Sequence, residues 1–554
     1  MGLYRRIKDN KKPLIRQIID NISAFLCNFV KKSEMNTLLI TLQSRNEVIG
    51  IKYLHYSLLN AGYNSHILYL PYVNLRNKKT LKSIKEFISE ISPGFIGISL
   101  MSIDYYKARD LTKYLKDNFK SIPVIWGGIH PTVMQEQCIE HADYVCIGEG
   151  ERTIVDFANA VSINNPEKVG IKDIKGLCYL EDGKIKKNPL YPVNIDLDTI
   201  PCYEYIPVHS FICHKKKITV LNKKLYTKYS YNTGNSYSVM SSRGCPFACT
   251  FCCNNFYSKL YKTKKVRHRS VQNIIFELKK AITDHPDIKY FNFEDDSFLS
   301  CSIEYLKEFC EEYKTKIKIP FIVHAIPLYI TKDKLKMLKD AGLVWINLGL
   351  ESGSNRTLKD IYKRQTLKED FLKAANIVKE LDLSGFYDVI VDNPFEKDDD
   401  RIETVKVLMQ VPRPFMPRIF SLIFYPGTEL FENAKKQCPE KIGSYLSNRF
   451  HTLKLENINN ITRFAPFLNQ KYMNKLIYLY KKNPNGNKLK IILLIVKLWV
   501  VLILQPIYYL PLTRKSYNGS YIKTIKVLPK LFVQYFFKHT YFLFKITVHN
   551  VWPF

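Results

Sequence analysis

Short apolar runs alternate with longer amphipathic stretches between residues 37 and 147. The short runs predict buried strands, and the longer stretches, with apolar residues at helical spacing, predict helices. We expect strands at Thr37–Thr41, Ser65–Leu70, Phe95–Met101, Pro123–Gly127 and Tyr144–Ile147, and helices at Val48–Ala61, Lys82–Ile91, Tyr105–Lys120 and Ile154–Ile163. Strands separated by helix-length segments indicate a doubly wound parallel sheet with helices on both faces.

In a sheet of this kind, ligands bind in the loops at the carboxyl ends of the strands. Those loops here are residues 42–47, 99–104 and 126–132. The last of them contains Gly127 and Gly128, which would let the backbone approach a flat ligand closely. No G-x-G-x-x-G sequence opens the first helix, which argues against a dinucleotide site.

A second alternation of strands and helices begins near residue 237. The expected strands are Tyr237–Ser242, Tyr290–Phe293, Phe321–Ala325, Trp345–Gly349, Tyr387–Val391 and Ile419–Phe424, and the expected helices are Val271–Thr283, Ile303–Lys314, Lys332–Ala341, Lys368–Leu381 and Asp400–Met409. Six strand–helix units predict a partial barrel of the TIM type, in which the chemistry belongs at the carboxyl ends of the strands.

The remaining segments set the domain boundaries. Residues 1–34 predict an amphipathic helix and residues 166–236 a polar linker, in which the charge-dense stretch 215–228 is most simply a solvated loop. The α/β segments are then residues 35–165 and 237–430, followed by a helical, basic and apolar region, residues 431–554.

The C-terminal region contains an apolar run at Lys490–Leu504, which Pro506 soon follows. Spanning a bilayer takes ~20 apolar residues, so this run is short for a transmembrane helix. Basic and aromatic residues follow it, a combination typical of a peripheral membrane contact. A helical cap over the mouth of the barrel explains the same pattern.

Composition limits the expected partners and cellular compartment of the protein. The 554 residues include 83 Lys and Arg against 51 Asp and Glu, and the formal net charge of +32 favours anionic partners, either nucleic acid or a membrane surface. The 13 cysteines are scattered outside one loop and do not form a disulfide framework. No apolar run with a small-residue cleavage site follows the basic N-terminus, so we expect a protein of the reducing cytoplasm, with a peripheral contact at the inner face of the membrane as one reading.

The strongest chemical motif is C-x3-C-x2-C, formed by Cys245, Cys249 and Cys252 in the loop after the first barrel strand. Thiolates are the ligands that iron–sulfur clusters prefer, and three of them leave one iron of a 4Fe–4S cube open to a small molecule. Cys253 follows Cys252 directly, and adjacent thiolates do not easily reach two corners of one cube. The alternative is a zinc site, but zinc usually takes four ligands in paired C-x2-C units, and no second pair follows.

The stretch from Ser241 to Asn255 resembles the cluster loop of the radical S-adenosylmethionine (SAM) superfamily. The resemblance implies a 4Fe–4S cluster held by the three cysteines, whose open iron binds the amino and carboxylate groups of SAM. It also assigns the strand-end residues: Glu294, Asp295 and Asp296 are expected near the SAM amino group, and Glu351 and Ser352 face its ribose or carboxylate. SAM is cationic at its sulfonium and ammonium, so surrounding carboxylates make physical sense. Each carboxylate taken singly is equally compatible with a surface or capping role.

The upstream domain resembles the cobalamin-binding domain that precedes the radical SAM core in one large subfamily. The matching pieces are residues 127–132 and 148–151. The resemblance places Ser99, Gly127, Gly128 and His130 at the cofactor. None of the 12 histidines lies in the D-x-H-x-x-G pattern that supplies a cobalt ligand. The resemblance therefore implies that cobalamin is bound without histidine, and we expect His130 to be a loop hydrogen-bonding residue. The alternative is a flavodoxin-like domain that binds nothing, because a fold alone does not establish a ligand.

The subfamily resemblance implies the reaction. An electron from an external donor such as a flavodoxin or ferredoxin enters the cluster and cleaves SAM to methionine and a 5′-deoxyadenosyl radical, which removes hydrogen from an unactivated carbon. Methyl transfer from methylcobalamin to a small or lipid-like substrate is the expected outcome, and no catalytic residue is assigned beyond the cluster ligands.

Three alternatives remain open. The first is a radical SAM cyclase or rearrangement enzyme. The second is an RNA-modifying enzyme, which the net charge favours, but the C-terminal region predicts apolar helix where those enzymes usually append a β-type RNA-binding module, so nucleic acid is not the expected partner. The third is a non-catalytic cobalamin-binding scaffold, which the intact three-cysteine loop argues against.

Overall fold

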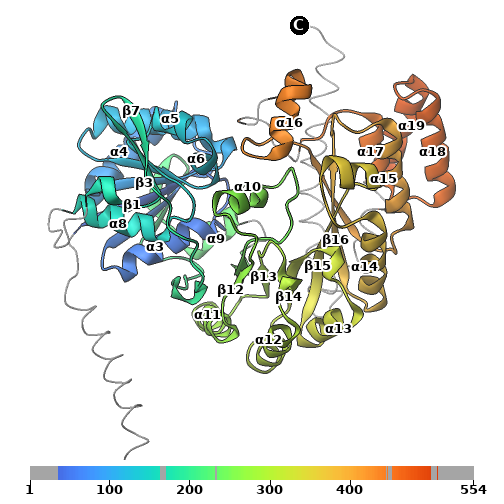
Figure 1. Ribbon diagram of the computed structural model, residues 1–554, viewed down its shortest axis with the longest axis horizontal. Helices are drawn as coiled ribbons and strands as arrows, with labels where there is room; N and C mark the ends of the chain where they lie inside the picture. The colour runs from blue at the N-terminus through green and yellow to red at the C-terminus, as the bar shows by residue number, and fades with distance from the viewer. Residues whose placement is uncertain are drawn as a thin grey trace, which may run out of the picture. The chain divides into compact units, whose positions relative to one another are not determined.

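The computed structural model describes residues 35–162, 170–230, 234–443 and 452–500, together with Leu446, Leu504 and Tyr508. The described residues form two compact units (Figure 1). Unit 1 comprises the described residues up to 194 and from 198 to 234. Unit 2 begins at residue 235 and includes residues 195–197. The amphipathic helix predicted for residues 1–34 and the aromatic tail beyond residue 508 lie outside the described residues.

Unit 1 is built on a nine-stranded sheet with the order β7-β6-β5-β4-β3-β1-β2-β8-β9. Its centre is parallel and consists of β1 (Asn36–Thr41), β2 (Asn64–Tyr69), β3 (Phe95–Ser99), β4 (Val124–Gly127), β5 (Tyr144–Cys146) and β8 (Ser210–His214). In the middle strand Leu38, Leu39 and Ile40 are all buried, because helices cover both faces. The strand order reverses between β1 and β3, so the loops after these two strands form the crevice where such sheets bind ligands.

The helices of unit 1 fall on the two faces of this sheet. Helices α3 (Ile49–Asn60) and α8 (Glu151–Val161) pack together on one face, and α4 (Lys78–Ile91) and α5 (Tyr105–Asn118) cover the other (Figure 1). The short helices α6 (Ile129–Val133) and α7 (Gln135–Ile139) follow β4. The predicted doubly wound fold is therefore confirmed.

The segment predicted as a linker differs from the expectation. Two antiparallel hairpins extend the sheet at its edges: β6 (Leu177–Glu181) with β7 (Lys184–Lys187), and β8 with β9 (Lys217–Val220). Helix α9 (Lys223–Tyr229) follows, so the stretch 215–228 is a strand and a helix and not a solvated loop. The outer strands β7 and β9 were missed because they lie at the solvated edges of the sheet and lack a buried apolar run; three of the four residues of β7 are lysines.

Unit 2 contains a six-stranded parallel sheet whose strands follow one another in chain order, which confirms the partial (β/α)6 barrel. The strands are β10 (Ser236–Val239), β13 (Tyr290–Phe293), β14 (Phe321–Ala325), β15 (Leu343–Glu351), β16 (Ser384–Val391) and β17 (Met416–Ser421). Along β14, Phe321, Val323 and Ala325 are buried, while the alternate Ile322 and His324 are partly exposed. This period of two separates an apolar outer face, packed under helices, from a more polar inner face.

Five helices cover the outer face of the barrel strands (Figure 1): α11 (Val271–Asp284), α12 (Ile303–Lys316), α13 (Lys332–Ala341), α14 (Lys368–Glu380) and α15 (Asp398–Gln410). Hydroxyl side chains cap the first turn of three of these helices. The hydroxyls of Ser270, Ser302 and Thr331 each accept a hydrogen bond from a backbone N–H in the first turn of α11, α12 and α13.

The C-terminal part of unit 2 is helical, as predicted. Its helices are α16 (Glu429–Gln437), α17 (Asn457–Phe464), α18 (Gln470–Lys482) and α19 (Asn487–Trp499). Helix α17 packs on α15, and α18 and α19 pack on α17. Within the described part of the chain, every helix is too short or too polar to cross a bilayer.

Candidate functional site

The three cysteines of the C-x3-C-x2-C motif lie in one apolar patch at the carboxyl end of β10. Phe247, Cys249 and Ile326 form its buried centre, and the partly buried Cys245, Cys252, Phe251 and Tyr329 pack against it. Burial raises the pKa of Cys245 to about 12 and that of Cys249 to about 11. A bound metal reverses this preference, because its positive charge stabilises the thiolate.

The three cysteines of the patch are compatible with a cluster that takes one thiolate from each of them. A cube holds each thiolate on a different iron, so it needs cysteines that share a patch without meeting at one point. Among the described residues, no group of three or more His, Cys, Asp or Glu side chains is placed to hold one ion. Cys253 begins α10 (Cys253–Leu260), and its thiol hydrogen-bonds with that of Cys252, which raises the pKa of Cys252.

Asp295 anchors the residues that lead into the cysteine loop. Its carboxylate accepts hydrogen bonds from the backbone N–H of Ser241 (3.3 Å) and from the hydroxyls of Ser241 (2.8 Å) and Ser242. Burial raises the pKa of Asp295 to about 6, against the opposing effect of these donors. A carboxylate engaged in this way holds the strand end in place and is not open to a ligand.

A second buried anchor, which the sequence analysis did not find, lies on the other side of the loop. The strands β11 (Ser242–Arg243) and β12 (Arg267–His268) pair across its base. Immediately after β12, the Arg269 backbone N–H donates to the Ser241 carbonyl at 2.9 Å, and its guanidinium pairs with Glu277 at 2.5 Å. Both side chains are almost fully buried, so the ion pair is shielded from solvent and salt.

Glu294 and Asp296, the neighbours of Asp295, are more accessible. Glu294 accepts a hydrogen bond from the Ser238 hydroxyl at 3.1 Å, and its other carboxylate oxygen lies 3.7 Å from Nε2 of His324. Its side chain is 35% exposed, while Asp296 is exposed. Of the three acids predicted near the SAM amino group, the structure leaves these two able to meet a ligand.

Glu351 stands at the end of β15 with a left-handed backbone, φ +63°. Burial raises its pKa to about 7, although the Arg364 guanidinium, 3.4 Å away, opposes the shift. Arg364 also donates to the Gly349 carbonyl at 2.9 Å and lowers the pKa of Cys249 from the value that burial alone would set. Arg364 thereby connects the strand end to the cysteine loop.

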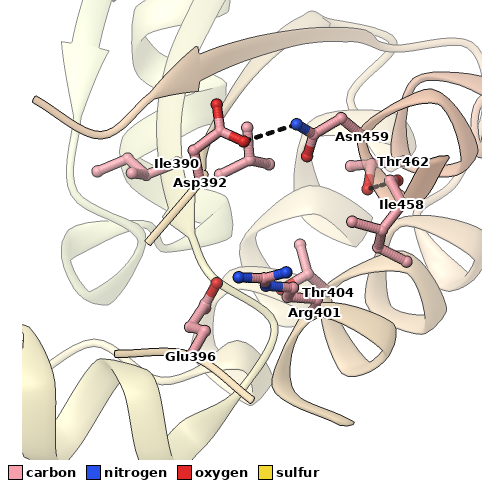
Figure 2. Close-up of a pocket in the computed structure, with 9 residues that line it drawn as sticks. Ile390, Asp392, Glu396, Arg401, Thr404, Ile458, Asn459 and Thr462 are labelled. Carbon is pink, nitrogen blue, oxygen red and sulfur yellow. Dashed lines mark hydrogen bonds between the residues drawn. The ribbon is translucent and has the colours of Figure 1, made fainter. Parts of the chain in front are cut away.

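Ser352 is fully buried and engaged elsewhere. Its hydroxyl donates to Glu396 at 2.8 Å and lies 3.3 Å from the hydroxyl of Thr404. Glu396 and Thr404 line a small cavity of about 10 Å³, room for about one water molecule (Figure 2). The prediction that Ser352 faces SAM stays a prediction, and its hydroxyl has a buried partner already.

Figure 2 shows Glu396 and Arg401 on one side of this cavity and a hydrogen bond from Asn459 to Asp392, 2.7 Å long, on the other. Burial raises the pKa of Glu396 to about 6. The cavity is too small for SAM or for any substrate of several atoms.

In unit 1, Ser99, Gly127, Gly128 and His130 lie at the carboxyl ends of β3 and β4. Gly128 has φ +101°, and a Cβ there would lie 2.8 Å from the Leu100 carbonyl oxygen. Glycine therefore allows the loops after β3 and β4 to touch each other, whatever ligand they face. This close contact, with the hydrogen bond from the Leu100 N–H to the Gly127 carbonyl at 3.0 Å, joins the two loops at the β3–β4 side of the crevice.

His130 is fully buried and held by its neighbours. Its Nδ1 lies 3.0 Å from the Ser102 hydroxyl, and the Tyr105 ring packs edge-on against it at 5.2 Å between centroids. Burial lowers its pKa to about 4, so the ring is neutral at physiological pH. This geometry is that of the predicted loop hydrogen-bonding residue.

Comparisons with known proteins agree with both units. The model of the radical SAM superfamily matches residues 239–408, and that of the B12 binding domain matches residues 35–158. An uncharacterized methyltransferase of Pyrococcus horikoshii is 27% identical over 64% of this chain and 72% of its own length. An anaerobic magnesium-protoporphyrin IX monomethyl ester cyclase of Cereibacter sphaeroides is 23% identical over 64% of this chain, but the match spans only 55% of the cyclase.

Solved structures share the architecture. The radical SAM methyltransferase TsrM from Kitasatospora setae, with cobalamin and a 4Fe–4S cluster bound, superposes with a TM-score of 0.57 at 16% identity, over 73% of this chain and 78% of TsrM. The cobalamin-dependent SAM radical enzyme OxsB superposes with a TM-score of 0.60 at 16% identity, over 94% of this chain and 82% of OxsB. At such identity the likeness shows the fold.

The two matched domains account for the cysteine patch in unit 2 and for the doubly wound sheet of unit 1. They define the cofactors as a 4Fe–4S cluster, SAM and cobalamin. The chain belongs to the radical SAM superfamily, and the B12-binding domain ahead of its radical SAM core makes it a cobalamin-dependent radical SAM enzyme.

Proposed function

We propose that this protein transfers a methyl group to an unactivated carbon of a small or lipid-like substrate. The single observation that carries the proposal is the placement of Cys245, Cys249 and Cys252 in one apolar patch at the carboxyl end of the first barrel strand. The bound cluster and SAM would supply a radical that removes a hydrogen atom from the substrate, and cobalamin would supply the methyl group.

The protein residues hold and shield these groups. In this proposal the three cysteines bind the cluster, and Glu294 and Asp296 face the cationic end of SAM with accessible carboxylates. Arg364 holds Glu351 beside the cysteine loop. Phe247, Ile326 and Tyr329 keep water from the cysteine patch, which limits side reactions of a radical.

The setting of the reaction is part of the same proposal. The cluster needs an external electron donor such as a flavodoxin or ferredoxin, and an oxygen-sensitive cluster needs a reducing compartment such as the cytoplasm. A lipid-like substrate would suit a peripheral position at the inner face of the membrane.

The decisive test is SAM cleavage by anaerobically purified protein under reducing conditions. The wild type should contain iron and sulfide and release 5′-deoxyadenosine. Cys249→Ala should lose most of the iron and all of that product, because each cysteine is expected to hold one corner of the cluster. Cys310→Ala is the matched control, since Cys310 is equally buried but lies on α12. A Cys249→Ala protein that keeps its iron, or a control that loses it, would overturn the assignment.

Methylation is distinguished from cyclisation by product mass. With SAM carrying a deuterated methyl group, a methyltransferase adds the labelled methyl to an acceptor in an anaerobic metabolite or lipid extract. A cyclase removes hydrogen and leaves the label in methionine. Label that appears only in methionine, with 5′-deoxyadenosine formed in full, would contradict methyl transfer but not the radical chemistry.

A further inference from the structure

Helix α19 turns a stripe of large apolar side chains to solvent. Ile491, Leu494, Ile495, Leu498 and Trp499 are each between 47% and 61% exposed. Their spacing of i, i+3, i+4, i+7 and i+8 places them along one face of the helix. The other face holds the buried Leu489 and Leu493 where α19 packs on α17 and α18. A contiguous exposed stripe of this kind marks an interaction surface.

The chain segment that carries this stripe contributes charge of one sign. From residue 457 to the end of the sequence, the chain contains 13 Lys and 2 Arg and no Asp or Glu. Five exposed lysines of α18 and α19 form no ion pair within the described part of the chain: Lys471, Lys475, Lys482, Lys488 and Lys490. Lys481, by contrast, pairs with Asp399 at 3.4 Å. A partner of this surface should therefore be both apolar and anionic.

We propose that the exposed face of α19, with its flanking lysines, docks on an anionic phospholipid surface. The apolar stripe would enter the boundary between headgroups and acyl chains, while the lysines meet the headgroup phosphates. Trp499 suits that boundary, because its indole is apolar over most of its surface and carries one N–H donor. The inference extends the proposed peripheral location by naming the surface, and it is independent of the radical chemistry.

Charge argues against the other occupants. A second copy that met this face with its own α19 face would bring the same lysines, and residues 509–554 of the chain also contain no acidic residue. Both would be repelled, since neither offers a compensating negative charge. A nucleic acid would attract the lysines but leave the five apolar side chains in water.

The test is flotation of the full-length protein with vesicles of phosphatidylcholine, alone or mixed with phosphatidylglycerol. We expect binding to the mixed vesicles, weakening with salt, and roughly tenfold or greater loss of binding in the double variant Leu494→Glu/Leu498→Glu. Phe276→Glu is the matched control, because Phe276 is 63% exposed on the barrel helix α11. The double variant should still release 5′-deoxyadenosine in lipid-free buffer, which separates this inference from the catalytic proposal.

Tryptophan fluorescence identifies the segment that touches the lipid. Trp126 and Trp345 are buried, so a blue shift on vesicles must come from Trp499 or Trp552. The shift should be lost in Trp499→Phe and retained in Trp552→Phe. The inference is overturned by the opposite pattern, by equal binding to uncharged vesicles, by unchanged binding of the double variant, or by a lipid-free dimer that this variant dissociates.

Discussion

Two acidic residues at neighbouring strand ends have a left-handed backbone conformation, which residues other than glycine rarely adopt. Glu351 ends β15 and Asp392 follows β16, both with φ +63°. Such strain persists only where the surroundings impose it, and it concentrates at functional sites. Arg364 holds the Glu351 carboxylate, and Asn459 and the backbone N–H of Lys454 donate to Asp392. The barrel mouth is therefore a place where the fold maintains unfavourable local conformations.

At the scale of residues, the sequence shows which side chains follow each strand but not which residues they contact. The spacing of the three cysteines was sufficient to identify their loop, because the motif is local. Asp295 and Ser352 were grouped with the ligand residues by position, yet the structure gives both of them buried partners far away in the chain. No local pattern distinguishes them from the accessible Glu294, since exposure is decided by the packing of separate elements.

Glu396 should make folding stability depend on pH. Its pKa is raised from 4.5 to about 6 in the folded protein, so between these values the folded state binds more protons than the unfolded one. Stability should therefore fall as pH rises through this window, by roughly 2 kcal/mol in total. Glu396→Gln should remove this part of the pH dependence. Relative to the wild type, the variant should therefore be more stable at pH 7.5 than at pH 5. Thermal unfolding at the two pH values measures it, with the exposed Glu432→Gln as control. An identical pH profile in Glu396→Gln would contradict the assignment.

At the scale of elements, much of the barrel was predictable because most of its strands are short and largely apolar, and three of its helices, α11, α12 and α13, begin at hydroxyl caps. The boundaries of β13, β14 and α13 agree with the expected ones to the residue. The hairpins of residues 177–220 were not predictable in the same way. Their outer strands β7 and β9 are largely exposed, so they are held mainly by backbone pairing with β6 and β8 and carry no buried apolar pattern.

The turn after β15 depends on close packing against α15. A Cβ on Gly353 would lie 2.5 Å from Cα of Thr404, a backbone atom that cannot move alone. Gly353→Ala should destabilise unit 2 by about 1–3 kcal/mol through overpacking. Gly50→Ala is the contrasting variant, since nothing lies within 4 Å of its new Cβ in the first turn of α3, and it should be neutral or stabilising. Urea unfolding measures both, and equal effects of the two substitutions would show that the packing argument is wrong.

At the scale of the whole molecule, the two units divide the cofactors between them, and this division can be tested. In the proposed function, Cys249 holds the cluster of unit 2, and we expect the loop contact at Gly128 to be needed for cobalamin binding in unit 1. Cys249→Ala should lose iron but keep cobalt, while Gly128→Val should lose cobalt but keep iron, because its side chain would push apart the loops after β3 and β4.

The products should separate in the same way. Without cobalamin, the Gly128→Val protein still has its cluster and should release 5′-deoxyadenosine without methylating anything, whereas Cys249→Ala should form neither product. For each variant, elemental analysis measures iron and cobalt, and mass spectrometry measures 5′-deoxyadenosine and the methylated product. Loss of both metals in Gly128→Val, with an unchanged unfolding temperature, would mean that the cluster depends on cobalamin. Methyl transfer that survives the loss of cobalt would mean that the methyl group has another source.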